Sequence, residues 1–216
     1  MARSVPTRKD VVKSIAGEIL HNYGRGRTLV AVDGRHGAGQ QQFAEDLAET
    51  LTLQDAKAFC ARIDDFFRPR ADREREGWLD GVAHYREAYD YSLLRRVLVD
   101  PFHTGGSTGF VLTGFDEVRD QPIFQPKWMS AGPDAVLIVE GVFLHRPELA
   151  RMWNYSIWLD TPTGPSDESA PDQPEKARDF AADEAYLAKV NPGELATVIL
   201  DNQDPANPIR VFADSC

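Results

Sequence analysis

Short apolar runs alternate with helical periodicities along most of the chain. The run TLVAVD at residues 28–33 is almost continuously apolar, which is typical of a strand buried on both faces of a parallel sheet. Four similar runs predict further strands at 57–64, 135–141, 155–160 and 196–202. Apolar residues at helical spacing predict helices at 8–22, 40–53, 83–99, 147–153 and 175–190. Because strands and helices alternate, the sequence predicts an α/β fold with a doubly wound, five-stranded parallel sheet and flanking helices.

Three stretches carry no such pattern. Residues 68–81 are charged and are predicted to be irregular, and residues 101–132 are predicted to form loops or short strands. Residues 161–174 contain four prolines and no apolar period, which predicts a mobile, acidic, lid-like segment. The sequence holds no internal repeat, so the 216 residues are predicted to form a single domain.

Charge and composition restrict the classes of partner. The net charge of −10 and the pI of about 5.0 argue against nucleic acid or an anionic membrane as partners, because both need a basic face. No apolar run approaches the roughly 20 residues that span a bilayer, and the first residues hold no apolar leader, so the chain is predicted to be cytoplasmic. Two cysteines and five histidines show no metal-ligand spacing, so no metal-binding residue is predicted.

The most informative motif is GRHGAGQQQ at residues 34–42, between a predicted strand and a predicted helix. Two glycines five positions apart match the spacing of a Walker A loop, whose backbone N–H groups hold phosphate. Lys and Ser or Thr complete such a loop, whereas this sequence has two glutamines there. The predicted phosphate-binding residues are Gly34, Arg35, His36, Gly37, Ala38, Gly39, Gln40 and Gln41.

The loop leaves one alternative open. Arg35 and His36 are candidates for the cation that the missing lysine would supply, or they are ordinary solvent-facing loop residues.

Carboxylates follow two of the predicted strands. Asp64 and Asp65 end the second strand, and Glu140 ends the strand at 135–141. Ligands of open parallel sheets bind at the carboxyl ends of the strands, where a carboxylate can accept a proton from a substrate hydroxyl. The alternative is that these acids only cap helices or turns. Asn202, at the end of the last predicted strand, is also an ordinary turn former.

Five segments together resemble the uridine kinase-like branch of the phosphoribulokinase/uridine kinase family, in the order of that family. They cover residues from about 28 to 210 and read TLVAVDGRHGAG, RIDDFFRPR, AYDYSLLRRVLVDP, AVLIVEGVFL with RPELARMW, and YLAKVNPGELATVILDNQDPANP. The resemblance implies a P-loop kinase that transfers the γ-phosphoryl group of ATP, with Mg²⁺, to a hydroxyl of a nucleoside or another small metabolite.

The resemblance also assigns roles to residues. It implies that Asp64 activates the acceptor hydroxyl and that Glu140 is an acid near the catalytic centre. It implies that Asn202 lies near the adenine of ATP. The acceptor is a small molecule, and the residues expected to line its site are Asp65, Phe67, Arg68 and Tyr89.

Three departures from the family pattern bear on activity. Gln40 and Gln41 replace the Lys and the Ser or Thr of the loop. Residues 167–184, where the family carries an arginine-rich lid, hold seven acids and two bases, and such a segment would repel a triphosphate. The stretch HYRE before Tyr89 lacks the acidic ribose-binding pattern of uridine kinases. Two functions therefore stay open: a small-molecule kinase with a modified phosphate site, or a catalytically silent relative that binds a nucleotide, metabolite or protein.

Overall fold

The computed structural model describes residues 6–75, 77–161 and 173–211. The predicted mobile segment at 161–174 lies almost entirely outside these residues. Of the helices within the described ranges, none has the length and apolar character needed to cross a membrane.

The described residues form a six-stranded central sheet in the order β10-β9-β8-β1-β7-β2. Five strands run parallel, as predicted: β1 (Thr28–Gly34), β2 (Lys57–Arg62), β7 (Ala135–Gly141), β8 (Tyr155–Asp160) and β9 (Val198–Asp201). The sixth strand, β10 (Ile209–Val211), is antiparallel to β9 and was not predicted. Residues 101–132 contribute two small antiparallel pairs: β3 (Phe110–Val111) with β6 (Trp128–Met129), and β4 (Phe115–Asp116) with β5 (Gln121–Pro122).

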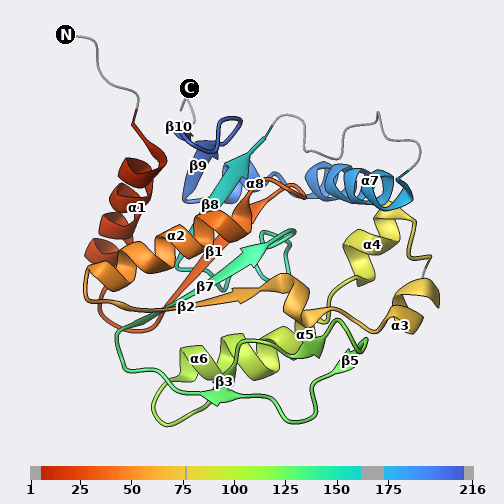
Figure 1. Cartoon of the computed structure of the whole chain (residues 1–216), viewed down its shortest axis with the longest axis horizontal. Helices are drawn as coiled ribbons and strands as arrows, with labels where there is room; N and C mark the ends of the chain where they lie inside the picture. Colours follow the sequence, from red (N-terminus) through yellow and green to blue (C-terminus); the bar gives the residue numbers. More distant parts are fainter. Residues whose placement is uncertain (1–5, 76, 162–172, 212–216) are drawn as a thin grey trace.

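Helices cover both faces of this sheet because alternate residues of each strand point to opposite sides. Val30 and Val32 of β1 pack in the hydrophobic core beneath α1 (Arg8–Tyr23) and α2 (Gln40–Leu53). Leu29 and Ala31 pack in a separate hydrophobic core on the opposite face of the sheet. Figure 1 shows α1 and α2 on one side of the sheet and the chain around α5 and α6 on the other. The helix α7 (Pro174–Lys189), close to the predicted 175–190, packs against α4 near the loop that precedes α2 (Figure 1).

The predicted helix at 83–99 is wrong as a single element. It is divided into α4 (Gly81–Glu87), α5 (Tyr91–Leu94) and the π-turn η2 (Arg95–Val99), and α6 (Asp100–Thr104) continues it. The break follows from bonds to a distant segment: the Ala88 carbonyl accepts from Arg68 N, and Asp90 N donates to Phe66 O. The Asp90 side chain then caps α5 by accepting from Leu93 N.

Two other local predictions are corrected. Residues 147–153 form turns and no helix, because Leu149 N and Ala150 N both donate to the carbonyl of Arg146 and the i→i−4 ladder is not continued. The segment 68–81, predicted to be irregular, contains the short helix α3 (Arg70–Arg75). The short helices η1 (Ile63–Phe66), directly after β2, and α8 (Pro192–Leu195) were also not predicted.

Candidate active site

The loop between β1 and α2 keeps the backbone of a phosphate loop. Gly37 and Gly39 have φ angles of 74° and 90°, which only glycine adopts without cost, so the chain turns sharply into the N-terminus of α2. Asn202, 2% exposed, braces this turn by donating from Nδ2 to the Ala38 carbonyl over 2.7 Å. Asn202 therefore contacts the loop itself, and its predicted place near an adenine stays a prediction.

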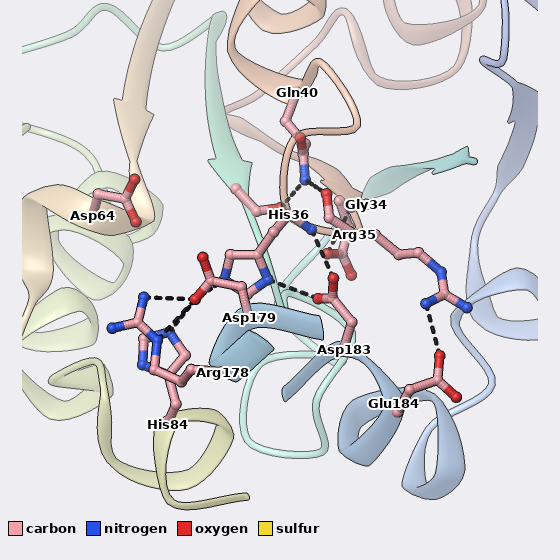
Figure 2. Close-up of polar contacts among 12 residues, drawn as sticks. Gly34, Arg35, His36, Gln40, Asp64, His84, Arg178, Asp179, Asp183 and Glu184 are labelled. Carbon is pink, nitrogen blue, oxygen red and sulfur yellow. Dashed lines mark hydrogen bonds and ion pairs between the residues drawn. The ribbon is translucent and has the colours of Figure 1, made fainter. Parts of the chain in front are cut away.

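The two glutamines do not reproduce the missing side chains. Gln40 is buried and folded into the loop, where its Nε2 donates to the carbonyl of Arg35 over 2.8 Å (Figure 2). Gln41 points along the exposed face of α2 and donates to Glu45 over 3.0 Å. Neither residue offers a cation for the phosphates or a hydroxyl for a metal, so these side chains do not fit the Mg²⁺–ATP that the resemblance implies.

Carboxylates of α7 form hydrogen bonds and ion pairs with the polar groups of the loop. The backbone N–H of His36 donates to Asp183 Oδ2 over 3.1 Å, and His36 Nδ1 lies 2.8 Å from Asp183 Oδ1. Arg35 donates to Glu184 over 2.8 Å (Figure 2). Burial lowers the pKa of His36, but the hydrogen bond and charge of Asp183 outweigh it, so the pKa is raised. Both candidate cations of the loop are thus already paired with acids.

A buried network fixes α7 in this position. Asp33, at the end of β1, is fully buried, and its Oδ2 accepts from Tyr186 Oη of α7 over 2.6 Å. The same oxygen lies 2.7 Å from His145 Nδ1, and Asp33 Oδ1 accepts from Gly34 N over 2.9 Å. Since the carboxylate bonds both to the first residue of the loop and to α7, the helix and the loop are held as one unit.

The second half of the site lies at the ends of β2 and β7. Asp64 of η1 accepts from Tyr89 Oη over 3.0 Å and from Arg62 Nη2 over 3.3 Å. Arg62 Nε lies 3.8 Å from Glu140 Oε1. Burial, and then the charge of Asp64, raises the pKa of Glu140 to about 7. We call Arg62, Asp64, Tyr89 and Glu140 the acceptor half of the site, and residues 34–41 the nucleotide half.

Gly141 allows the two carboxylates of the acceptor half to approach each other. Its φ angle is 136°, and a Cβ atom at this position would lie 2.3 Å from Ile63 Cγ2. Any other residue would therefore clash with Ile63 at the start of η1, so the packing of η1 against the end of β7 would have to shift.

A pocket of about 320 Å³ joins the two halves. It is lined by His36, Gly37, Gly39, Gln40, Gln41, Arg62, Asp64, Tyr89, Glu140, Gly141 and Val142. The pocket thus brings both predicted catalytic residues to the predicted loop. Its ionisable lining sets Asp64 and Glu140 against Arg62 and His36, so the pocket has no excess of positive charge for a polyphosphate and suits a neutral, hydroxyl-bearing ligand.

The remaining predicted substrate residues do not line this pocket. Phe67 stacks on the Tyr89 ring with centroids 4.7 Å apart and so supports its position. Arg68 lies in a neighbouring pocket on the other side of Tyr89, paired with Glu87. Asp65 is partly buried, which raises its pKa, and its backbone carbonyl accepts from Gly114 N. Direct substrate contact by these three residues remains a prediction.

Some residues of the site were missed in the sequence. Arg62 ends β2 on an exposed face and looked like a surface charge. Asp179 and Asp183 stand four positions apart, which puts them on one face of α7, and this spacing could have shown an acidic stripe aimed at one target. His84, buried in α4, carries no sequence signal of its own.

Comparison with solved structures identifies the fold. A structure described as a possible uridine kinase from Bacillus stearothermophilus superposes with a TM-score of 0.75 at 24% identity, covering 89% of this chain and 98% of that one. A structure described as a fructose transport system kinase from Silicibacter sp. TM1040 gives 0.59 at 22% identity, with coverages of 80% and 94%. The YGR205w protein gives 0.59 at 14% identity, with coverages of 90% and 93%.

Comparisons of sequence alone give no match. No protein-family model and no curated protein matches the chain. At the level of the fold, however, the solved structures confirm what the motifs indicated: the chain has the P-loop kinase fold of the uridine kinase-like proteins.

Proposed function

We propose that this chain is a uridine kinase-like phosphotransferase scaffold that binds a small hydroxylated metabolite in its acceptor half and has lost efficient phosphoryl transfer from ATP. The observation that carries this proposal is the contact between His36 and Asp183. A backbone N–H of the loop that would bind phosphate donates instead to a buried carboxylate of the same chain. ATP would have to displace this carboxylate without the help of a lysine.

The acceptor half supports the binding part of the proposal. Asp64 can accept a hydrogen bond from a substrate hydroxyl, and Arg62 and Tyr89 hold this carboxylate in place. Glu140, with a pKa raised to about 7, can present either a protonated or an ionised carboxyl near neutral pH. Two carboxyl groups and a tyrosine hydroxyl are the groups that recognise vicinal hydroxyls of nucleosides and sugars.

A direct test is a screen of nucleosides and sugars for binding to the whole chain. The affinity of each compound that binds is then measured by calorimetric titration. We expect a hydroxylated compound to bind to the wild type and to bind at least about tenfold more weakly to Asp64→Asn, since a hydrogen bond to a charged group contributes about 1.5–3 kcal/mol. Arg119→Gln, a change at an exposed surface ion pair, is the matched control and should bind like the wild type. Equal affinities of Asp64→Asn and the wild type would exclude this pocket as the binding site of the compound.

One observation favours a second function, a working small-molecule kinase. The acceptor half retains a carboxylate that can take the proton of an acceptor hydroxyl, and a kinase needs this group. Incubation of the wild type with ATP, Mg²⁺ and each compound from the screen distinguishes the two functions. Phosphorylated product that disappears in Asp64→Asn would establish the kinase, whereas binding without product supports the silent scaffold.

A further inference from the structure

Two histidines and a carboxylate from three separate elements converge beside the nucleotide half. His36 comes from the loop, His84 from α4 and Asp179 from α7. One ligand atom of each residue lies within 4.8 Å of the other two, and each histidine Nε2 is 3.9 Å from Asp179 Oδ1. Figure 2 shows these three side chains gathered in one place, apart from Asp64.

We propose that His36, His84 and Asp179 bind a divalent transition-metal ion, with Zn²⁺ as the preferred ion. Imidazole nitrogen and carboxylate oxygen are both common zinc ligands, with bonds of about 2.0–2.2 Å. Ligand atoms around a tetrahedral ion of this size lie about 3.4 Å apart. Starting from 4.8 Å or less, each pair therefore has to close by at most about 1.4 Å, which side-chain rotation can supply.

The state of His84 is a second, independent observation. Its side chain is 3% exposed, and its imidazole makes no hydrogen bond to another described residue; Asp179 at 3.9 Å is the acid within ion-pair range. Buried polar groups are nearly always hydrogen-bonded, whereas this ring meets Asp179 only at 3.9 Å, a separation that an ion bound between the two would bridge.

His36 is oriented as a metal-binding histidine usually is. Its Nδ1 lies 2.8 Å from Asp183 Oδ1, and Asp183 is 1% exposed. In protein metal sites the ligating histidine typically donates its second ring N–H to a carboxylate, which fixes the ring and leaves the other nitrogen for the metal. Here that other nitrogen is Nε2, the atom that faces Asp179.

One group in the structure competes with the ion. The guanidinium of Arg178 contacts Asp179 Oδ1 at 2.5 and 2.8 Å and lies 4.6 Å from the ring of Trp78. Metal binding requires Arg178 to release this oxygen, or the ion to use the other oxygen of Asp179. Removal of the guanidinium should therefore strengthen metal binding, an effect opposite in sign to the loss of a ligand.

A bound ion would connect the loop, α4 and α7. It would also bring two positive charges next to the pocket that His36 lines, in the half of the site that lacks its lysine. With three protein ligands, a four-coordinate ion keeps one position for water or for an oxygen of a bound molecule.

The test is a titration of the full chain with Zn²⁺ at pH 8 against a chromophoric chelator, with Co²⁺ absorption as a second readout. We expect one ion per chain with micromolar or tighter affinity. Asp179→Asn and His84→Gln should weaken binding at least about tenfold, and Asp183→Asn about 10–100-fold through loss of the orienting bond. Arg178→Gln should tighten binding. His103→Gln, an exposed histidine of α6, is the control and should leave the affinity unchanged.

Circular dichroism establishes that each variant is folded. If His84→Gln does not fold, the metal affinities of Asp179→Asn and Arg178→Gln test the proposal instead. Both side chains are more exposed than His84, so these variants are expected to fold. Wild-type protein that binds neither Zn²⁺ nor Co²⁺ at about 100 μM overturns the proposal. Equal affinities of Asp179→Asn, Arg178→Gln and wild type overturn it as well.

Discussion

The two halves of the site differ in how many of the side chains that a kinase needs are present. In the acceptor half, Asp64 and Glu140 lie at the ends of adjacent strands with Arg62 and Tyr89 around them, as the chemistry of a hydroxyl acceptor requires. In the nucleotide half, the glycine turn is kept, but Gln40 is folded inward and Asp183 accepts from the loop N–H. Loop geometry and loop chemistry therefore depend on different residues, and the first can be present without the second.

The physical reason lies in what each feature depends on. The turn depends on Gly37 and Gly39 and on the strand and helix that flank it, which also build the core. The charge for phosphate depends on one side chain that contributes nothing to packing. The fold is therefore compatible with Gln40 at this position, where the buried amide donates a hydrogen bond to the turn.

The largest effect is expected for Asp183→Ala, which breaks the contact between α7 and the nucleotide half. The variant loses both bonds from His36 to the buried carboxylate, and since each hydrogen bond to a charged group contributes about 1.5–3 kcal/mol, the loss is about 3–6 kcal/mol. We expect the free energy of unfolding in denaturant to fall by this amount. Glu184→Ala, in the more exposed pair with Arg35, is the matched control and should cost less than about 1 kcal/mol. Equal effects of the two variants would mean that α7 is not held by the Asp183 contact.

Glu140→Gln tests whether the acceptor half holds a carboxyl group with a raised pKa. Folding raises the pKa of Glu140 from 4.5 to about 7, so the folded protein binds this proton more tightly than the unfolded chain does. The stabilising effect of that proton is present below pH 4.5 and is lost as the pH rises through 7. The variant should therefore be more stable than the wild type by about 3 kcal/mol at pH 8 and no different at pH 4.

Denaturant unfolding at several pH values checks this prediction. Glu49→Gln, at an exposed position of α2, is the control and should show no such pH-dependent difference. A stability difference between Glu140→Gln and wild type that does not change between pH 4 and pH 8 would mean that Glu140 is not held at a raised pKa.

The double variant Gln40→Lys with Gln41→Thr addresses the nucleotide half directly. A charge-assisted hydrogen bond contributes about 1.5–3 kcal/mol, so the restored lysine should raise the affinity for ATP with Mg²⁺ by roughly tenfold to a hundredfold, measured by calorimetry. Adding Asp183→Asn to this variant should raise the affinity further. If the double variant gains nothing and the triple variant gains strongly, the carboxylate of α7 is the main obstacle to ATP, and the glutamines are secondary.

The smallest effect is expected for Tyr186→Phe, which removes the hydroxyl that joins α7 to Asp33 of β1 and that also accepts from His145 N. The hydroxyl donates to the buried Asp33, and loss of a buried hydrogen bond costs about 1–3 kcal/mol. Thermal unfolding should show a modest fall in Tm with the fold retained. No change in Tm would mean that this hydroxyl does not anchor the helix.

The sequence predicted the parts of the molecule that depend on local pattern. The five parallel strands, α1, α2 and α7 follow from apolar periodicity, and the loop follows from the spacing of Gly34 and Gly39. The break in the predicted helix at 83–99 could not be predicted, because it depends on bonds from Arg68 and to Phe66, far away in the chain. The edge strand β10 is short and largely exposed, so it carries almost no hydrophobic signal.

In the site, too, some features follow from local sequence pattern and others depend on contacts between distant residues. Asp64, Glu140 and the loop were found because each ends a strand with a recognisable pattern. The contacts that change the interpretation, Asp183 on His36 and His84 beside Asp179, join residues separated by about a hundred positions or more. Only the three-dimensional arrangement of α4, α7 and the loop brings them together.

A calorimetric titration of the wild-type protein with ATP, with and without Mg²⁺, is the decisive measurement for the proposal that the nucleotide half has lost its ATP chemistry. We expect no heat of binding up to millimolar ATP in either condition, because the loop N–H of His36 donates to Asp183 and Gln40 is folded into the turn. Micromolar, Mg²⁺-dependent binding to the wild type would overturn the proposal and would mean that the loop binds nucleotide without a lysine.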